Sequence, residues 1–236
     1  DMDCFKEADK IQTSLGYLPG EIAFIDSMTG MEFIRFVAKM KKMRDLGLAQ
    51  ELMKMFELNP SGKLKKMSKG MKQKIGIVCA FMNPLASILI LDEPTSGLDP
   101  LMQNRFVELI LSEKKKGKTI LMSSHMFEEI ERTCDRAAII RDGRLVAVEE
   151  IEKLKEGRQK VIEITFREPA MAEAFAAAFP EVSYQAGEKA VTAKVGKNID
   201  PFLKKASAYT ITDLDVRTQS LEEFFMHFYG EEAARP

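Results

Sequence analysis

Residues 87–100 constrain the fold of this 236-residue chain more than any other stretch. Four consecutive large apolar residues, 88–91, are followed by Asp92, Glu93 and Pro94. Such an apolar run predicts a strand buried on both faces, the kind that a parallel sheet uses. In open α/β sheets, ligands bind at the carboxyl ends of strands, where these two carboxylates fall. One carboxylate could hold Mg²⁺ and the other polarise a water, although a bare Asp-Glu pair is more often a plain acidic loop.

Composition narrows the classes of protein to which the chain can belong. Hydrophobic residues make up 45% and charged residues 30%, as in ordinary globular proteins. The 35 basic and 36 acidic side chains leave a net charge of -1, so we expect no nucleic-acid partner. Cys4, Cys79 and Cys134 form no C-x-x-C pair, and no apolar run approaches the roughly 18 residues of a membrane-spanning helix. The sequence therefore predicts a cytoplasmic protein.

Other segments place polar residues at the ends of predicted elements. Residues 15–21 predict a strand that runs into a loop, and residues 28–58 show helical spacing of apolar residues. Ser68 is an N-cap signal before a long helical pattern, and a helix N-terminus is a natural anion site. The surrounding lysines, taken alone, indicate a solvated patch. Residues 119–124 predict a second buried strand, which ends at His125, where a lone histidine is usually structural.

The order of these motifs, from about residue 16 to residue 148, resembles the ATP-binding cassette (ABC) ATPases. Residues 87–100 are similar to the Walker B motif and D-loop, His125 to the switch histidine, and residues 134–144 to the end of the core. Residues 67–71 are similar to the Leu-Ser-Gly-Gly-Gln signature, although Lys69 and Met71 depart from it. The resemblance implies an α/β fold, a P-loop NTPase (RecA-like) ABC ATPase core with a helical subdomain at about residues 22–84.

The resemblance also implies roles for individual residues. Asp92 would hold Mg²⁺, Glu93 would be the general base or polarise the attacking water, and His125 would hydrogen-bond the γ-phosphate of ATP and orient Glu93. Asp99 would communicate across a dimer of two ATPase domains. The ATP held by the second domain would contact the signature residues, which are Ser68, Lys69, Gly70 and Met71.

Two features depart from the family pattern. At the Q-loop, Gly20 stands where a Gln normally reaches Mg²⁺ and the attacking water, and Glu21 follows it. Either Glu21 substitutes for that Gln or the loop acts only as a hinge. Residues 117–119 (Gly-Lys-Thr) are no P-loop, because Ser112 stands at the required first glycine and the order is helix to strand. No other segment fits Walker A, so we expect an N-terminally truncated core and weak or absent ATP hydrolysis by residues 1–236 alone.

The remainder of the chain predicts a second domain. We assign residues 1–157 to the partial ATPase domain and residues 158–236 to a small accessory α+β domain. Its predicted order of elements, β-α-β-β-α-β, is ferredoxin-like. A capping box from Ser220 to Glu223 then opens a final helix, on which His227 is expected to be structural.

The resemblance implies the nucleotide-binding subunit of an ABC transporter, of the exporter type with separate membrane subunits. Its expected cofactors are ATP and Mg²⁺, and its expected partners are a second ATPase domain, as a homo- or heterodimer, and integral membrane transporter subunits. That places it peripherally on the inner face of the cell membrane. One alternative is a soluble ABC ATPase that acts on ribosomes or nucleic acid, and another is a non-hydrolysing binding module. A single cassette with a small tail favours the transporter, and Glu93 argues against the binding module.

Overall fold

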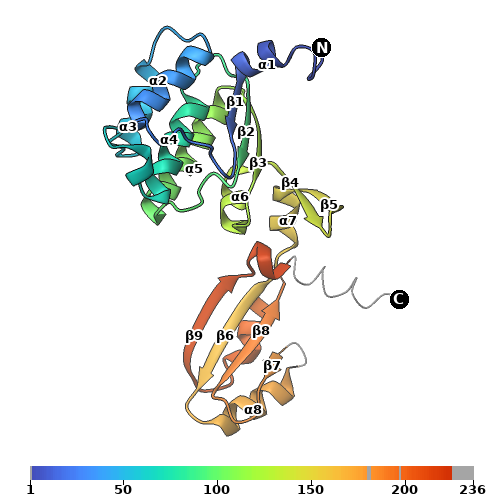
Figure 1. Ribbon diagram of the computed structural model, residues 1–236. Coiled ribbons are helices and arrows are strands. Elements are labelled where there is room, and N and C mark those ends of the chain that lie inside the picture. Colours follow the sequence, from blue (N-terminus) through green and yellow to red (C-terminus); the bar gives the residue numbers. More distant parts are fainter. Residues whose placement is uncertain (1, 180–181, 197, 225–236) are drawn as a thin grey trace. The chain divides into compact units, whose positions relative to one another are not determined.

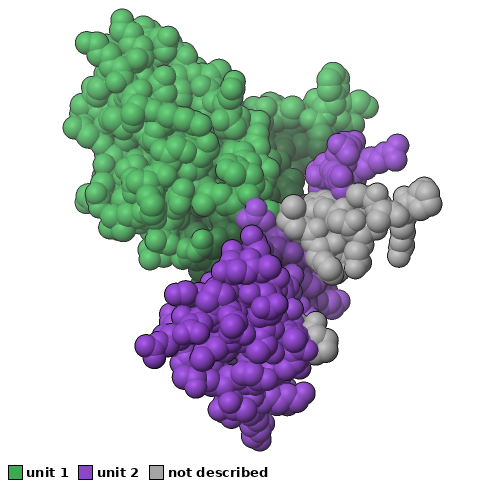
Figure 2. Space-filling view, turned by 90° about the horizontal axis from the view of Figure 1, so that it is seen from below, with its two compact units in different colours: residues 1–133 green, residues 134–236 purple. Residues whose placement is uncertain are grey.

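The computed structural model describes residues 2–179, 182–196 and 198–224, and the chain divides into two compact units (Figure 1). Unit 1 comprises residues 1–133 and unit 2 residues 134–236, which Figure 2 shows in separate colours. The division falls earlier than the expected boundary after residue 157. The hairpin of β4 (Arg136–Arg141) and β5 (Arg144–Glu150) belongs to unit 2, as does α7 (Ile151–Gly157), which follows it in the chain. The assignment of residues 1–157 to an ATPase domain stays a prediction.

The centre of unit 1 is a three-stranded parallel sheet in the order β1-β2-β3. The strands are β1 (Leu15–Leu18), β2 (Ile88–Asp92) and β3 (Thr119–Ser123). The register pairs Leu18 with Leu91 and Asp92 with Ser123. The carboxyl ends of all three strands therefore meet at one edge of the sheet, where the loops after the strands begin.

Several helices of unit 1, among them α4 (Lys69–Phe81), share a core with one face of this sheet. At Gly16 in β1, a Cβ atom would lie 2.4 Å from the carbonyl oxygen of Ala80 in α4, so only glycine fits this approach. Thr29 and Glu32 form a reciprocal capping box that begins the second helix. In chain order, the described helices of unit 1 are α1 (Ala8–Ser14), α2 (Gly30–Met40), α3 (Gly47–Met55), η1 (Leu64–Lys66), α4 (Lys69–Phe81), α5 (Pro100–Lys115) and α6 (Phe127–Thr133).

The other face of the sheet corrects a prediction from the sequence. Leu89 and Leu91 of β2 are buried, but their neighbour Ile88 is 46% exposed and Leu121 of β3 is 66% exposed. Tyr17 of β1 is also exposed, at 54%. The prediction that β2 and β3 are buried on both faces is therefore wrong for these residues. Successive side chains point to opposite faces, and the described part of unit 1 packs its core only on the face of Leu89.

Unit 2 contains a four-stranded antiparallel sheet in the order β7-β8-β6-β9. Its core includes Ile162 and Ile164 of the central strand and Phe175 and Phe202 of the two helices. This arrangement confirms the predicted β-α-β-β-α-β order and the ferredoxin-like class. The elements are β6 (Lys160–Phe166), α8 (Pro169–Ala178), β7 (Val182–Tyr184), β8 (Ala190–Val195), α9 (Asp200–Ala206) and β9 (Ile211–Thr218).

The predicted capping box lies just after β9. The backbone nitrogen of Ser220 donates to Glu223 at 3.0 Å, and the nitrogen of Glu223 donates to the Ser220 hydroxyl at 3.0 Å. His227 lies outside the described residues. Among the described helices, none has the length and apolar character needed to cross a membrane.

Candidate functional site

The edge where the strands of unit 1 end gathers groups from three loops around Asp92. The Ser123 hydroxyl at the end of β3 donates to Asp92 Oδ1 at 2.5 Å. The backbone nitrogen of Gly20, after β1, donates to Asp92 Oδ2 at 3.3 Å. A Cβ at residue 20 would lie 2.9 Å from that same oxygen, so glycine allows the loop to come this close. Loops far apart in sequence thus converge on one exposed carboxylate.

Glu93 occupies an unusual backbone conformation directly after Asp92. Its φ is 45°, in the left-handed region that non-glycine residues seldom adopt. The surroundings hold it there: its nitrogen donates to the backbone oxygen of Ser123 at 3.2 Å and to the Ser123 hydroxyl at 3.0 Å. From α4, the buried amide of Gln73 donates to the carbonyl oxygens of Glu93 at 3.3 Å and Pro94 at 2.8 Å. Strained residues that are fixed in this way cluster at functional sites.

His125 faces Glu93 across the same edge. Its Nδ1 lies 2.6 Å from Glu93 Oε2, and the two side chains remain 74% and 34% exposed. An ionised carboxylate only accepts hydrogen bonds, so Nδ1 is the donor beside an ionised Glu93. The free Nε2 accepts from a water when the imidazole is neutral, and donates to a phosphate oxygen only when the ring is an imidazolium. The arrangement can therefore hold a water or a phosphate oxygen within reach of both side chains.

The groups at Asp92 suit Mg²⁺ bound together with a phosphorylated ligand. Mg²⁺ usually keeps several waters and takes only one or two carboxylates from the protein, with substrate phosphates as its other ligands. Asp92 is an exposed carboxylate, with the hydroxyl of Ser123 beside it. A protein-only cage is not present: the described residues form no cluster of three or more acidic, histidine or cysteine side chains with metal-site geometry.

The signature-like residues make contacts within their own chain. Ser68 caps α4 by accepting from the nitrogen of Met71 at 3.2 Å, as the sequence predicts. Lys69 Nζ donates to the Ser96 hydroxyl at 2.9 Å. A Cβ on Gly70 would lie 2.6 Å from the carbonyl oxygen of Gly97, so this glycine is required by the turn that leads into α5. Nucleotide binding by these residues stays a prediction.

Asp99 and Lys118 have clear structural partners. Asp99 caps α5 by accepting from the nitrogen of Met102 at 3.0 Å. Lys118, part of the rejected Gly-Lys-Thr sequence, pairs with buried Glu113 at 2.5 Å. Burial raises the pKa of Glu113, but the hydrogen bonds and charges of Lys116 and Lys118 outweigh burial, so the pKa lies below its ordinary value. The helix-to-strand context from α5 to β3 agrees with the rejection of a P-loop here.

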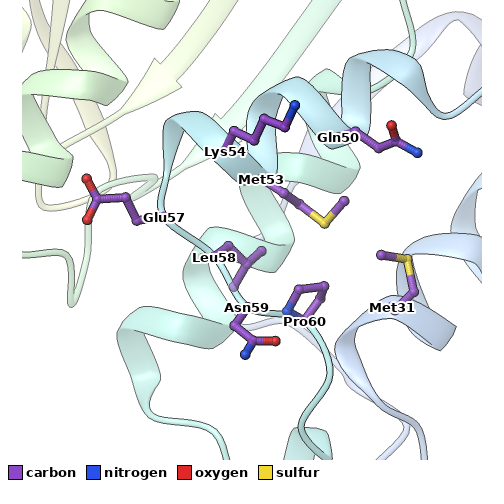
Figure 3. A pocket seen from close by; sticks show the side chains of 8 residues that line it. All are labelled: Met31, Gln50, Met53, Lys54, Glu57, Leu58, Asn59 and Pro60. Atoms are coloured by element: carbon purple, nitrogen blue, oxygen red, sulfur yellow. The ribbon is translucent and has the colours of Figure 1, made fainter.

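A groove of about 320 Å³ joins the loop after β1 to the start of α4. Its lining residues are Gly20, Glu21, Ile22, Phe24, Asp26, Lys69, Lys72 and Gln73. It brings together three of the predicted site residues, Gly20, Glu21 and Lys69. A larger hollow of about 490 Å³, shown in Figure 3, lies among α2, α3 and the segment after α3. Side chains such as Met31 and Met53 line it, and none of the predicted site residues does.

Three residues at this edge escaped the sequence analysis: Gln73, Ser123 and Glu129. Each of them contacts a partner at least 20 positions away in the chain, so the sequence around it does not reveal that contact. A buried polar residue inside an apolar helix, such as Gln73 in α4, is the one signal that could have indicated such a role.

Comparison with known proteins shows what this chain is similar to. Over residues 59–128 it matches a family model described as "AAA domain, putative AbiEii toxin, Type IV TA system". It is 37% identical over 145 residues to an uncharacterized ABC transporter ATP-binding protein of Synechocystis, a match covering 56% of this chain and 39% of that protein. With the ABC transporter ATP-binding protein NatA of Bacillus subtilis it shares 31% identity over 163 residues, 66% of each chain. The chain is a homologue of ABC transporter ATP-binding proteins.

Solved structures support the same fold. The ATP-binding subunit of an ABC transporter matches with a TM-score of 0.59 and 29% identity, over 65% of this chain and 66% of that one. The ATP-binding cassette MJ0796, solved as a dimer bound to ADP and Pi, matches with a TM-score of 0.55 at 22% identity, over 64% of this chain and 68% of that one. Unit 1 therefore has the P-loop NTPase fold of an ABC ATPase cassette. This ABC homologue spans only 39–53% of the length of the first three curated relatives.

Proposed function

We propose that this chain belongs to an ATP-hydrolysing subunit that powers an ABC transporter in the export direction. The observation that carries the proposal is the contact of 2.6 Å between His125 Nδ1 and Glu93 Oε2, one residue after the exposed carboxylate of Asp92. A strained acidic residue paired with a solvent-accessible imidazole is the arrangement expected where a water attacks a phosphate.

Each residue of this edge has a role in that chemistry. Asp92, with Ser123 beside it, would hold Mg²⁺, which neutralises charge on the phosphates when bound. Glu93 orients and polarises the attacking water, and His125, as an imidazolium, donates to Glu93 through Nδ1 and to the γ-phosphate through Nε2. Gln73 and Ser123 keep the backbone of Glu93 in the left-handed conformation that aims its side chain at His125.

The proposal requires a second ATPase domain. Ser68 and Gly70 at the start of α4, with Lys69 and Met71 beside them, would contact ATP held by the other domain. Asp99, in the turn before α5, would communicate between the two. Membrane subunits would receive the resulting motion, with this chain on the inner face of the membrane. The dimeric form of MJ0796 supports this only as a likeness of fold.

ATP turnover by the full-length protein containing this sequence tests the proposal. The substitution Glu93→Gln keeps the size of the side chain but removes its basicity, so turnover should nearly stop. Unchanged turnover would contradict the mechanism. Co-purification with an integral membrane protein supports the transport role, whereas stable association with ribosomes would overturn it.

A further inference from the structure

A buried carboxylate behind the Glu93–His125 pair has no role in the chemistry described so far. Glu129 of α6 is only 4% exposed. Its Oε2 accepts from the Ser124 hydroxyl at 2.6 Å and lies 3.3 Å from the donating hydroxyl of Thr95. Its Oε1 is buried and has no hydrogen-bond partner among the described atoms.

The two partners of Glu129 come from the two loops that carry the catalytic candidates. Thr95 follows Glu93 by two residues, and Ser124 immediately precedes His125. Ser124 also accepts from the nitrogen of Met126 at 3.1 Å, which fixes the turn into α6. One side chain therefore connects the loop after β2 to the loop after β3, close enough to Glu93 and His125 to interact with both electrostatically.

Burial of this carboxylate opposes its ionisation. Desolvation raises the pKa of Glu129; the hydroxyls of Ser124 and Thr95 act in the opposite direction, and the nearby charge of Glu93 adds to the rise. A buried carboxylate with one unpaired oxygen is a costly way to fill space, since an apolar residue of similar size avoids the desolvation. Such a group is expected where its hydrogen bonds do something that packing alone does not.

We propose that Glu129 is a positioning residue that holds the loops of Glu93 and His125 in register. This inference deepens the proposed function and rests on it. Without the carboxylate, Ser124 and Thr95 lose their common acceptor. The hydrogen bonds of Ser123 still hold the ends of β2 and β3 together. Ser124, and with it His125, is no longer connected through Glu129 to the loop of Glu93. His125 then no longer keeps Nδ1 at hydrogen-bond distance from Glu93.

Nitrogen NMR of the histidine rings tests the geometry without any ATP turnover. The chain has two histidines, so ¹⁵N-histidine labelling gives two ring systems to assign. With the imidazole neutral, Nδ1 and Nε2 of His125 should show well-separated shifts, because Glu93 selects one tautomer. In Glu129→Ala these two shifts should converge, whereas Glu128→Gln, a change at the exposed neighbour, should leave them unchanged.

A second variant keeps the test possible if Glu129→Ala does not fold. Thr95→Val removes only the hydroxyl that Glu129 accepts from, and it should shift the His125 signals in the same direction. Unchanged His125 signals in both variants, even with a lowered melting temperature, would reduce Glu129 to a structural role and overturn the proposal.

Kinetics of the full-length protein provide the second readout. Misplacement of a catalytic group should lower kcat for ATP about 10- to 100-fold in Glu129→Ala, with KM changed less than about twofold. Partial recovery in Glu129→Gln is expected, because the amide oxygen can still accept from Ser124. An equal loss in Glu128→Gln would overturn the assignment. If the wild-type protein shows no turnover, the proposed function fails while the NMR comparison still decides the positioning role.

Discussion

The sheet of unit 1 leaves Leu121 and Tyr17 more than half exposed, whereas the sheet of unit 2 completely buries Ile162 and Ile164. The two units also differ in how exposed and how strained their polar groups are. The edge of unit 1 holds Glu93 at a positive φ beside a solvent-accessible histidine. In unit 2, by contrast, Arg217 pairs with Glu223 in a bidentate contact at a capping box.

The difference indicates a division of labour between the two units. Unit 1 keeps strained and exposed groups at a strand edge, as a site that acts on a ligand requires. Unit 2 has a continuous aromatic core, with Phe175 stacked on Phe179 at 4.2 Å and Tyr209 edge-on to Phe175 at 4.9 Å. We therefore expect substitutions of the polar groups at the strand edge of unit 1 to change chemistry, and substitutions in the core of unit 2 to change stability.

The largest effect should come from Glu93→Gln in unit 1. Loss of a catalytic base or water-orienting carboxylate should lower the ATP turnover of the full-length protein about 10²- to 10⁴-fold. Steady-state release of phosphate measures this, with Glu128→Gln on the exposed side of α6 as the matched control. A comparable loss in the control would show that charge near the site, and not Glu93 itself, sets the rate.

The next effect concerns the core of unit 2. Phe175→Ala should destabilise unit 2 by about 3–5 kcal/mol, because it removes a fully buried aromatic side chain and leaves a cavity. Urea unfolding followed by tyrosine fluorescence includes the signal of Tyr209, which touches this ring, together with the signals of Tyr17, Tyr184 and Tyr229. Met171→Ala on the same helix, at a 40% exposed position, should cost under about 1 kcal/mol. Equal losses in the two variants would contradict the packing described for unit 2.

Two leucines test the difference between the buried and the exposed face of the unit 1 sheet. Leu89→Ala should cost about 2–5 kcal/mol, since its side chain is buried against the helices. Leu121→Ala should cost less than about 1 kcal/mol in this chain, because its side chain is already largely in water. Chemical denaturation compares them directly. A large loss from Leu121→Ala would mean that the exposed face is covered in solution.

The smallest effect is a pH dependence in unit 2. The hydrogen bonds from Arg217, followed by the backbone of Ser220, lower the pKa of Glu223 from 4.5 to about 2. A lowered pKa adds stability above pH 4.5, and that stability disappears as the pH falls from 4.5 towards 2. Because Glu223 is 42% exposed, we expect no more than about 1 kcal/mol.

Melting of Glu223→Gln across this pH range measures the contribution. The variant should lose stability at neutral pH and converge with the wild type in acid, whereas Glu222→Gln, an exposed neighbour, should follow the wild type throughout. Parallel curves for Glu223→Gln and the wild type would contradict the linkage.

The local sequence pattern placed Asp92, Glu93 and His125 at the ends of apolar strands, as the structure has them. Their roles in a site came from the resemblance to ABC ATPases and stay predictions. The local pattern also predicted the order of elements in unit 2, where alternating apolar residues indicated a strand at residues 161–166. It could not find Gln73 or Glu129, because their partners are brought together only by the parallel sheet. It also predicted burial for both faces of β2, since apolar character alone does not say which face is covered.

The central claim is that Glu93 of one chain and Ser68 of another act on the same ATP. Light scattering of the full-length Glu93→Gln protein, with and without ATP, tests it most directly. We expect a dimer that forms only with ATP and is lost when Ser68→Arg is added to the same chain. A dimer that forms equally well without ATP, or one that is indifferent to Ser68→Arg, would contradict it.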